Sequence, residues 1–220
     1  MKTSPSKIEQ GSMAIIGREL AERGIALPAE NAAVILRCIH ASADFDYAEK
    51  LRFSPDAVSR AVEALRSGAQ IVTDTNMALA GLSRPGLARL GGAAFCFMAD
   101  ERIAQAAKEK GTTRAAAAMD YAAEHHPGAI LAVGNAPTAL LQIAEQIEGG
   151  LRPALVIAAP VGFVNVVESK ERVWTVCLAH DVPCIAAMGR KGGSSIAAAI
   201  LNALIYTAAD MLEPEKRGWN

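Results

Sequence analysis

The sequence has few aromatic residues and no excess of basic charge. Aromatic side chains make up 5% of its 220 residues, whereas hydrophobic residues make up 51% and include many alanines. This balance favours closely packed helices over a β-sandwich. The formal net charge of −1 argues against a nucleic-acid surface, because binding to phosphate backbones normally needs a basic excess. An anionic ligand would need a local cluster of arginine or lysine.

Paired cysteines and nucleotide-binding motifs are also missing. No Cys-x-x-Cys pair is present, which argues against a zinc site, and we predict no metal site of any kind. Neither a Walker A sequence nor a Gly-x-Gly-x-x-Gly sequence occurs, which disfavours a nucleotide cofactor. We expect the thiols to be buried and reduced, as is common in cytoplasmic proteins. They belong to Cys38, Cys96, Cys177 and Cys184.

No stretch has the length of a membrane-spanning helix or the pattern of a secretion signal. Residues 1–10 are polar and lack the apolar core of a signal peptide. The apolar run 154–164 is too short to cross a bilayer. Polar residues interrupt the apolar segment 196–212, so we predict a buried helix there. The sequence therefore predicts a cytoplasmic protein that does not contact a membrane.

Short apolar runs alternate with helical stretches along the chain, after an N-terminal helical region at about 12–24 and 29–44. The predicted strands are 69–73, 93–98, 129–133, 154–159 and 183–188. The predicted helices are 55–67, 101–110, 113–124, 137–147, 165–179 and one that begins near Ser194. Continuous apolar runs are typical of strands buried on both faces. The sequence thus predicts a single α/β domain over residues 1–220, with a mostly parallel central sheet flanked by helices.

Arg37 and His40 stand three residues apart in the apolar segment 31–46, where a helix would place them on one face. A guanidinium can hold an anionic group, and an imidazole can transfer a proton near neutral pH. His40 is therefore a candidate acid or base, with a structural histidine as the competing interpretation. Asp44 and Asp46 follow closely, and we expect them to orient the ring or to raise its pKa.

Polar and small residues follow the predicted strands, at the edge where parallel sheets bind ligands. The loops are 74–77, 134–138, 160–163 and 189–194. Free N–H groups at Asn135 and Ala136, before a helix that begins at Pro137, could bind a carboxylate; a capped turn without a ligand explains the same pattern. Arg190 and Lys191 stand among glycines and suit a bulky anion, the alternative being a solvated basic turn.

The remaining charged residues give weaker signals. Arg84 and Arg114, taken singly, are typical of surface positions, although Arg114 stands at a predicted helix start. We expect Glu168 and Lys170 to be exposed or ion-paired. Adjacent histidines diverge on a helix and a histidine at a helix end is favourable there, so we predict no catalytic or metal role for the other histidines. These are His125, His126 and His180.

Read together, these segments resemble the precorrin-8X methylmutase family of the cobalamin pathway, including its cobalt-precorrin-8 members. The matching stretches occur in the family's order and span nearly the whole chain. They are Ser-Met-Ala-Ile-Ile (12–16), Arg-Cys-Ile-His (37–40), Thr-Asp-Thr-Asn-Met (73–77), Gly-Thr-Thr-Arg (111–114), Gly-Asn-Ala-Pro-Thr-Ala-Leu (134–140), Pro-Val-Gly-Phe-Val (160–164), Glu-Ser-Lys (168–170) and Gly-Arg-Lys-Gly-Gly-Ser (189–194). The run of 134–140, 160–164 and 168–170 is the most specific part.

The resemblance implies an isomerase that moves a methyl group from C-11 to C-12 of precorrin-8 or cobalt-precorrin-8, giving hydrogenobyrinic acid or cobyrinic acid. It implies no cofactor, since cobalt, where present, is part of the substrate. It also implies a homodimer with the active site near the interface. The segments 44–48 and 74–77 look more like the cobalt-dependent branch.

The family's histidine falls on His40, which the resemblance makes the catalytic residue. Substrate contacts that the resemblance implies fall on Ser12, Arg37, Thr113 and Arg114. Residues of the strand-end loops, and one further arginine, complete the expected substrate-binding set. They are Asp74, Arg84, Asn135, Arg190, Gly192 and Gly193.

Two other classes of protein stay open. A non-catalytic tetrapyrrole carrier would need the same pocket, and methyl migration by the pure protein would separate it from an isomerase. A nucleotide-dependent α/β enzyme is disfavoured by the missing phosphate-binding motifs. Failure to bind ATP or NAD would exclude it.

Overall fold

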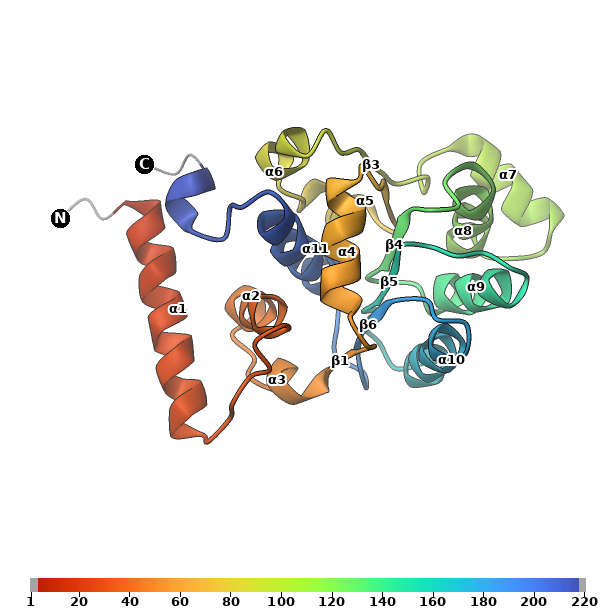
Figure 1. Cartoon of the computed structure of the whole chain (residues 1–220). Helices are drawn as coiled ribbons and strands as arrows, with labels where there is room; N and C mark the ends of the chain where they lie inside the picture. Colours follow the sequence, from red (N-terminus) through yellow and green to blue (C-terminus); the bar gives the residue numbers. More distant parts are fainter. Residues whose placement is uncertain (1–3, 218–220) are drawn as a thin grey trace.

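The computed structural model describes residues 4–217, so the outer three residues at each end of the predicted domain lie outside it. The strands are β1 (Leu51–Phe53), β2 (Ile71–Thr73), β3 (Ala94–Phe95), β4 (Ile130–Val133), β5 (Leu155–Ala158) and β6 (Cys184–Ala187). They form a six-stranded sheet in the order β1-β6-β5-β4-β2-β3 (Figure 1). Within it β1 and β6 pair antiparallel and the other neighbours pair parallel. The predicted α/β class is confirmed.

Each of the five predicted apolar runs contains a shorter strand. The sixth strand, β1, has no counterpart among the predictions. It is a three-residue edge strand that pairs with β6, in the register Leu51 opposite Ala187. Three residues are too few to show a strand period, so this strand depends on its partner rather than on a local pattern.

The helices include the predicted ones and several short additions. They are α1 (Pro5–Glu22), α2 (Ala32–Ser42), α3 (Tyr47–Lys50), α4 (Ala57–Arg66), α5 (Asn76–Ala80), α6 (Arg84–Arg89), α7 (Glu101–Glu109), α8 (Arg114–His125), α9 (Pro137–Glu148), α10 (Val166–Ala179), α11 (Ser194–Ala208) and the 3₁₀ turn η1 (Pro214–Arg217). The first helix begins well before the predicted start near residue 12. Pro5 is tolerated there because the first helical turn needs no N–H.

Successive residues of each central strand face two different cores. In β4, Ile130 and Ala132 pack with α2, α4 and α11 on one face, whereas Leu131 and Val133 pack with α8, α9 and α10 on the other (Figure 1). Because helices cover both faces, all four side chains are fully or almost fully buried. This two-sided burial explains why the strands appear as continuous apolar runs in the sequence.

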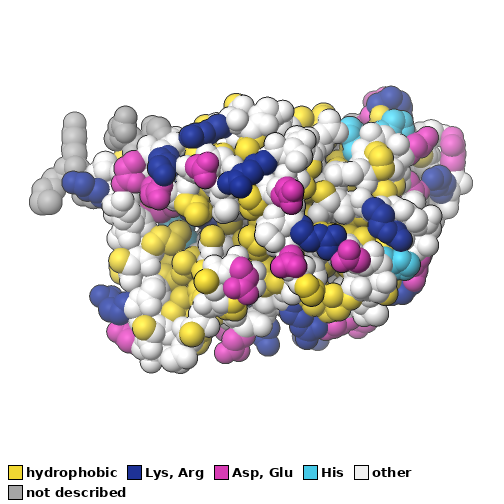
Figure 2. All heavy atoms as spheres, in the orientation of Figure 1, with side chains coloured by type: hydrophobic (Ala, Val, Ile, Leu, Met, Phe, Trp, Pro, Cys, Tyr) yellow, Lys and Arg dark blue, Asp and Glu magenta, His cyan; other side chains and the backbone are white. Residues whose placement is uncertain are grey.

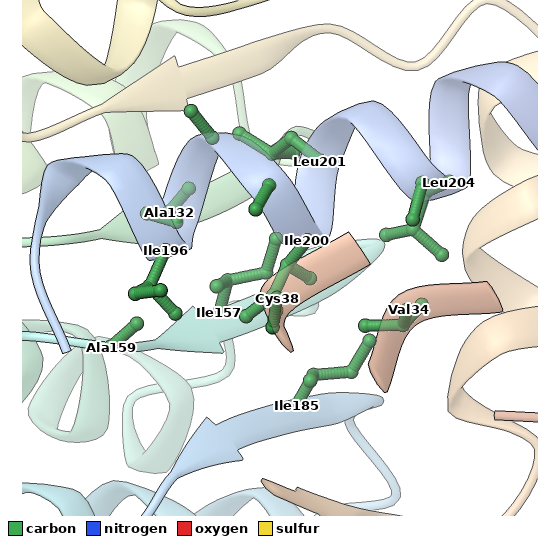
Figure 3. Packing of buried hydrophobic residues seen from close by; sticks show 14 of the residues in the cluster. Val34, Cys38, Ala132, Ile157, Ala159, Ile185, Ile196, Ile200, Leu201 and Leu204 are labelled. Atoms are coloured by element: carbon green, nitrogen blue, oxygen red, sulfur yellow. The ribbon is translucent and has the colours of Figure 1, made fainter. Parts of the chain in front are cut away.

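The predicted buried helix is α11, which is apolar on nearly every side. Figure 3 shows Ile200 of α11 beside Cys38 of α2 and Ile157 of β5, whereas Leu204 of α11 faces Val34 of α2. These side chains are at most 1% exposed. The packing of α11 on α2 fixes the helix that carries Arg37 and His40. Among the described residues, no helix is both long and apolar enough to cross a membrane.

Helix α1 lies on the outer side of α2 and also contacts η1 (Figure 1). Figure 2 shows hydrophobic side chains gathered between α1 and α4 on this face, with positive and negative side chains scattered around them. This face carries no field of a single sign, in keeping with the net charge of −1. Positive charge must therefore be concentrated locally if the protein binds an anion.

Candidate active site

The four strand-end loops, 74–77, 134–138, 160–163 and 189–194, lie together at the carboxyl edge of the sheet; we call them the carboxyl-edge loops. The hydroxyl groups of Thr75 and Ser194 are 2.8 Å apart. The N–H of Gly162 donates to the carbonyl of Arg190 at 3.2 Å. The predicted convergence of these loops is confirmed.

Asp74 lies inside the carboxyl-edge loops and is 1% exposed. Its carboxylate accepts the backbone N–H groups of Gly134, Asn135 and Ala136, each at 2.8 Å. Burial raises the pKa of Asp74, and these three bonds oppose that rise. Of the two interpretations of this loop, the structure supports the turn without a ligand, because the chain's own carboxylate occupies these N–H groups. Asp74 holds the loop, and the exposed side chain of Asn135 stands on its surface.

Gly192 and Gly193 have φ angles of +157° and +123°, which residues other than glycine rarely adopt. A Cβ atom on Gly192 would lie 2.3 Å from the carbonyl oxygen of Ala159 and 2.7 Å from that of Pro160. The N–H of Gly193 donates to the same Ala159 carbonyl at 2.8 Å. Glycine is therefore needed for this loop to lie directly against the end of β5.

Arg190 is exposed, and its guanidinium lies 5.5 Å from the centre of the Phe163 ring. The next residue, Lys191, donates to Asp44 at 2.6 Å and to Asp46 at 2.8 Å. The hydrogen bond from Lys191 lowers the pKa of Asp44. The expectation that the two aspartates act on His40 is therefore wrong. They tie the chain that leaves α2 to the 189–194 loop.

Thr113 and Arg114 stand at the start of α8, beside the start of α9. The Thr113 hydroxyl caps α8 by accepting the N–H of Ala116 at 3.2 Å. It also lies 2.7 Å from the hydroxyl of Thr138 in the 134–138 loop. Arg114 is exposed and donates to the carbonyl of Met98 at 3.2 Å. Both residues therefore flank the carboxyl-edge loops.

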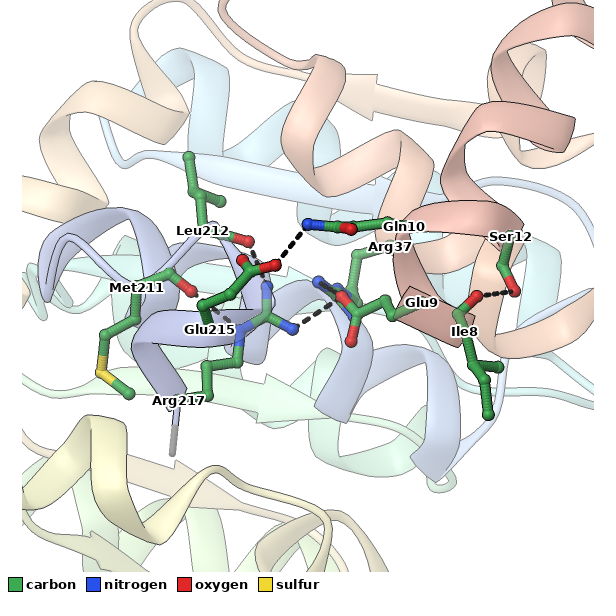
Figure 4. A network of polar contacts seen from close by, with 9 residues as sticks. All are labelled: Ile8, Glu9, Gln10, Ser12, Arg37, Met211, Leu212, Glu215 and Arg217. Carbon is green, nitrogen blue, oxygen red and sulfur yellow. Dashed lines mark hydrogen bonds and ion pairs between the residues drawn. The ribbon is translucent and has the colours of Figure 1, made fainter. Parts of the chain in front are cut away.

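A second group of charged residues lies where α1, α2 and η1 meet, and we call Glu9, Arg37 and Arg217 the arginine cluster. One carboxylate oxygen of Glu9 accepts from Arg37 at 2.7 Å and from Arg217 at 2.6 Å (Figure 4). Glu9 is 5% exposed and Arg217 is 6% exposed. Burial would raise the pKa of Glu9, but the hydrogen bonds and charges of the two arginines lower it below its ordinary value.

Cavities open on both sides of Arg37. One, of about 510 Å³, is lined by Arg37, Arg84 and Arg217 together with Asn202 and Tyr206. The structure thus brings Arg84, which the sequence placed singly at the surface, to the same cavity as Arg37. A second cavity of about 490 Å³ lies between α1 and α2 and is lined by Arg37 with several apolar side chains. These are Met13, Ala33, Leu36 and Leu212.

His40 lies in the last turn of α2 and is half-buried. Burial lowers the pKa of His40 below 6.5, the positive charges of Arg37 and Arg217 lower it further, and Glu9 opposes them. These effects favour the neutral form of the imidazole. The predicted placement of Arg37 and His40 on one helix is confirmed.

Ser12 lies on α1 and is also half-buried. Its hydroxyl donates to the carbonyl of Ile8 within the same helix at 3.0 Å (Figure 4). It neighbours Met13, which lines the cavity between α1 and α2. Ser12 itself lines neither of the two cavities that Arg37 borders.

Two further expectations concern buried residues. Lys170 was expected to be exposed or ion-paired, but it is fully buried and bonds to backbone carbonyls; Glu168 is exposed as expected. The cysteines are free, and three of them are buried, while Cys96 is half-buried. No local sequence pattern indicates Glu9 and Arg217, because their partners lie far away along the chain.

The contribution of the arginine cluster to stability is expected to depend on pH. The pKa of Glu9 is lowered in the folded state, so its stabilisation is complete above its ordinary value of about 4.5 and is lost as the pH falls through the lowered pKa. At pH 7, Glu9→Gln should lower the free energy of unfolding by about 3 kcal/mol, because two largely buried guanidinium groups lose this carboxylate. Urea unfolding of both proteins between pH 3 and 7 measures the difference. A difference that stays constant down to pH 3 would contradict this account.

Arginines around a cavity, a half-buried histidine on the same helix as Arg37, and glycine-built loops at the carboxyl edge of a parallel sheet are typical of an α/β enzyme that acts on an anionic small molecule. A sequence model of the precorrin-8X methylmutase family matches residues 7–207. The chain belongs to the precorrin-8X methylmutase family. It is accordingly an isomerase.

Individual relatives agree over nearly their whole lengths. A cobalt-precorrin-8 methylmutase of Salmonella typhimurium is 43% identical over 208 residues, which are 92% of this chain and 95% of the relative. A precorrin-8X methylmutase of Pseudomonas aeruginosa is 38% identical over 200 residues, which are 90% and 93% of the two chains. The crystal structure of a precorrin-8X methylmutase from Thermus thermophilus has a TM-score of 0.81 at 40% identity and covers 92% of this chain and 98% of its own.

Proposed function

We propose that this protein moves a methyl group from C-11 to C-12 of cobalt-precorrin-8 or precorrin-8, giving cobyrinic or hydrogenobyrinic acid, a step of cobalamin biosynthesis. The observation that carries the proposal is that His40 shares helix α2 with Arg37, which lines a cavity together with Arg84. Relatives with methylmutase names match almost end to end. This supports an isomerase over a non-catalytic tetrapyrrole carrier.

The substrate is a large, mostly apolar macrocycle with carboxylates on its rim. Arginines can pair with those carboxylates through two parallel hydrogen bonds, which fix orientation as well as adding energy. Arg37, Arg84, Arg114 and Arg190 are the candidates. The protein thereby holds the ring in a single pose, and this pose sets the geometry from which the methyl group migrates.

His40 exchanges a proton with the macrocycle and sets the tautomer from which the methyl group migrates. Burial and the positive charges of Arg37 and Arg217 lower its pKa, which favours the neutral imidazole as a proton acceptor in general acid–base catalysis. In the migration the C-11 to methyl bond breaks as the C-12 to methyl bond forms. The reaction is therefore balanced within the substrate and needs no methyl donor and no electrons.

We also propose that the reaction needs no cofactor and that cobalt, where present, belongs to the substrate. Incubation with metal-free and with cobalt-loaded substrate, each without added metal, nucleotide or methyl donor, tests this by absorption spectra, because migration changes the conjugation. The 44–48 and 74–77 segments favour the cobalt-loaded substrate. Activity that is lost on chelation with metal-free substrate, and restored by a divalent ion, would contradict the proposal.

A cytoplasmic homodimer with the active site near the interface completes the proposal. Phe163 and Val164, beside Arg190, are 81% and 77% exposed. Apolar side chains this exposed are typical of interaction surfaces, and loops alone rarely enclose so large a ligand. Sedimentation at working concentration should give the mass of two chains, and the mass of one chain would contradict a dimer.

Arg114→Ala is expected to weaken substrate binding by one to two decades, since the loss of a hydrogen bond to a charged group is worth roughly 1.5–3 kcal/mol. Fluorescence or absorption titration with the substrate measures the affinity. Arg18→Ala serves as the control, because Arg18 lies on α1 with a side chain that is 67% exposed and pairs only within its own helix in the described structure. Equal affinities in the two variants would place Arg114 outside the pocket.

A further inference from the structure

Lys170 on α10 is fully buried and is among the largest side chains with no exposure to solvent. Its ammonium group donates to the backbone carbonyls of Gly189 and Lys191, each at 2.8 Å. Burying a charged group is costly unless hydrogen bonds compensate, and bonds from a charged donor are stronger than neutral ones. A charged side chain at so buried a position suggests a specific task at the carbonyls that it binds.

The two carbonyls stand on either side of Arg190. Holding them fixes the peptide plane that precedes Arg190 and the plane that follows Lys191, which restrains the direction in which the Arg190 side chain leaves the loop. The carbonyl of Arg190 itself accepts the N–H of Gly162 at 3.2 Å. The exposed guanidinium then lies over Phe163.

The same loop also contacts the segment that follows α2. Lys191, whose carbonyl Lys170 binds on the inside, reaches outward with its own ammonium group to Asp44 and Asp46. Asp44 follows His40 by four residues. Lys170 therefore anchors a loop that carries Arg190, a candidate for binding the substrate. The same loop contacts the segment that follows His40.

We propose that Lys170 is a positioning residue of the active site, which holds the 189–194 loop in the shape that presents Arg190 to a carboxylate of the substrate. The inference rests on the proposed function for the identity of that substrate. Gly192 and Gly193 cannot hold the loop by themselves, because glycine has the greatest conformational freedom of all residues. Lys170 supplies the restraint from the core.

If Lys170 served only to fill space, a side chain of similar volume without N–H donors would replace it without loss of substrate binding. Methionine is also long and unbranched, so Lys170→Met keeps most of the volume and removes only the donors. Burial lowers the pKa of Lys170 to about 8. Since a neutral amine still has two N–H groups, the loop should stay held above that pH as well.

The experiment compares Lys170→Met with Val176→Ala, a change at a 3% exposed position nearer the other end of α10. We expect KM to rise tenfold or more in Lys170→Met and to stay within twofold in Val176→Ala, even where both lose thermal stability. Hydrogen exchange of the 189–194 amides should accelerate only in Lys170→Met. The double variant Lys170→Met with Arg190→Ala should have a KM close to that of Arg190→Ala alone, because both substitutions act through Arg190.

An unchanged KM in Lys170→Met, equal KM values in both single variants, or multiplying effects of Lys170→Met and Arg190→Ala would each overturn the proposal. If the Met variant does not fold, Lys170→Gln replaces it, since an amide keeps two N–H donors on a shorter side chain; the same direction of change is expected. If the parent protein does not convert the corrinoid, the proposed function fails. The hydrogen-exchange comparison still shows whether Lys170 holds the loop.

Discussion

His40→Asn is expected to bind the substrate with nearly parental affinity and to turn it over about 10²–10⁴-fold more slowly. Asparagine is of similar size and can form hydrogen bonds, but it cannot gain or lose a proton near pH 7. His40 is only half-buried and lies in the last turn of α2, so the fold should tolerate the change. Single-turnover rates and substrate titrations separate the two effects.

His125→Asn is the matched control for this variant. His125 lies in the last turn of α8, is exposed, and its ring stacks on Tyr121 at 3.9 Å between centres. Its replacement should leave the rate within a few-fold of the parent. Circular dichroism of both variants confirms folding. Near-parental turnover by His40→Asn would remove His40 from the chemistry.

Gly192→Ala is expected to destabilise the protein by about 3 kcal/mol or more and to abolish most activity. A disallowed backbone conformation costs roughly 1–3 kcal/mol, and overpacking typically costs a similar amount. The added Cβ would lie 2.3 Å from a carbonyl oxygen of the rigid end of β5, so the loop that carries Arg190 must move. Urea unfolding and substrate turnover measure the two consequences.

Gly150→Ala isolates the backbone part of that effect. Gly150 has a φ of +110°, but an added Cβ would meet no atom within 4 Å. It should therefore show a smaller loss of stability and keep its activity. Equal losses in both variants would mean that the contact with β5 is unimportant.

The layers of the fold follow from local sequence patterns. Residues such as Leu131 and Ala132 are apolar in succession because helices cover both faces of β4, and such runs can be recognised without a structure. Strand β1 cannot be recognised in this way, since its three residues owe their conformation to β6. Loop positions also follow from chain order, which is why the carboxyl-edge loops could be predicted.

The electrostatics of the site were harder to predict. Arg37 and His40 are near neighbours in the sequence, so their shared helix was predictable. Glu9 bonds to Arg217 across 208 positions, and no local pattern signals such a pair.

Asp74 and Lys170 were misjudged for a related reason. Charged residues are expected to be exposed unless they are paired, but the partners of both are backbone groups. A sequence does not display which backbone groups lie nearby. Asp44 was likewise assigned to His40 by proximity in sequence, whereas the fold gives it to Lys191.

The central claim is that this protein moves a methyl group within its substrate. The most direct measurement uses substrate whose C-11 methyl carbon is labelled with ¹³C, in both cobalt-loaded and metal-free forms, followed by NMR of the product. The account predicts that the label appears fully on C-12 without added donor, and that His40→Asn binds the same substrate without moving it. Tight binding by the parent protein with the label still on C-11 in both substrates would contradict the account and indicate a carrier.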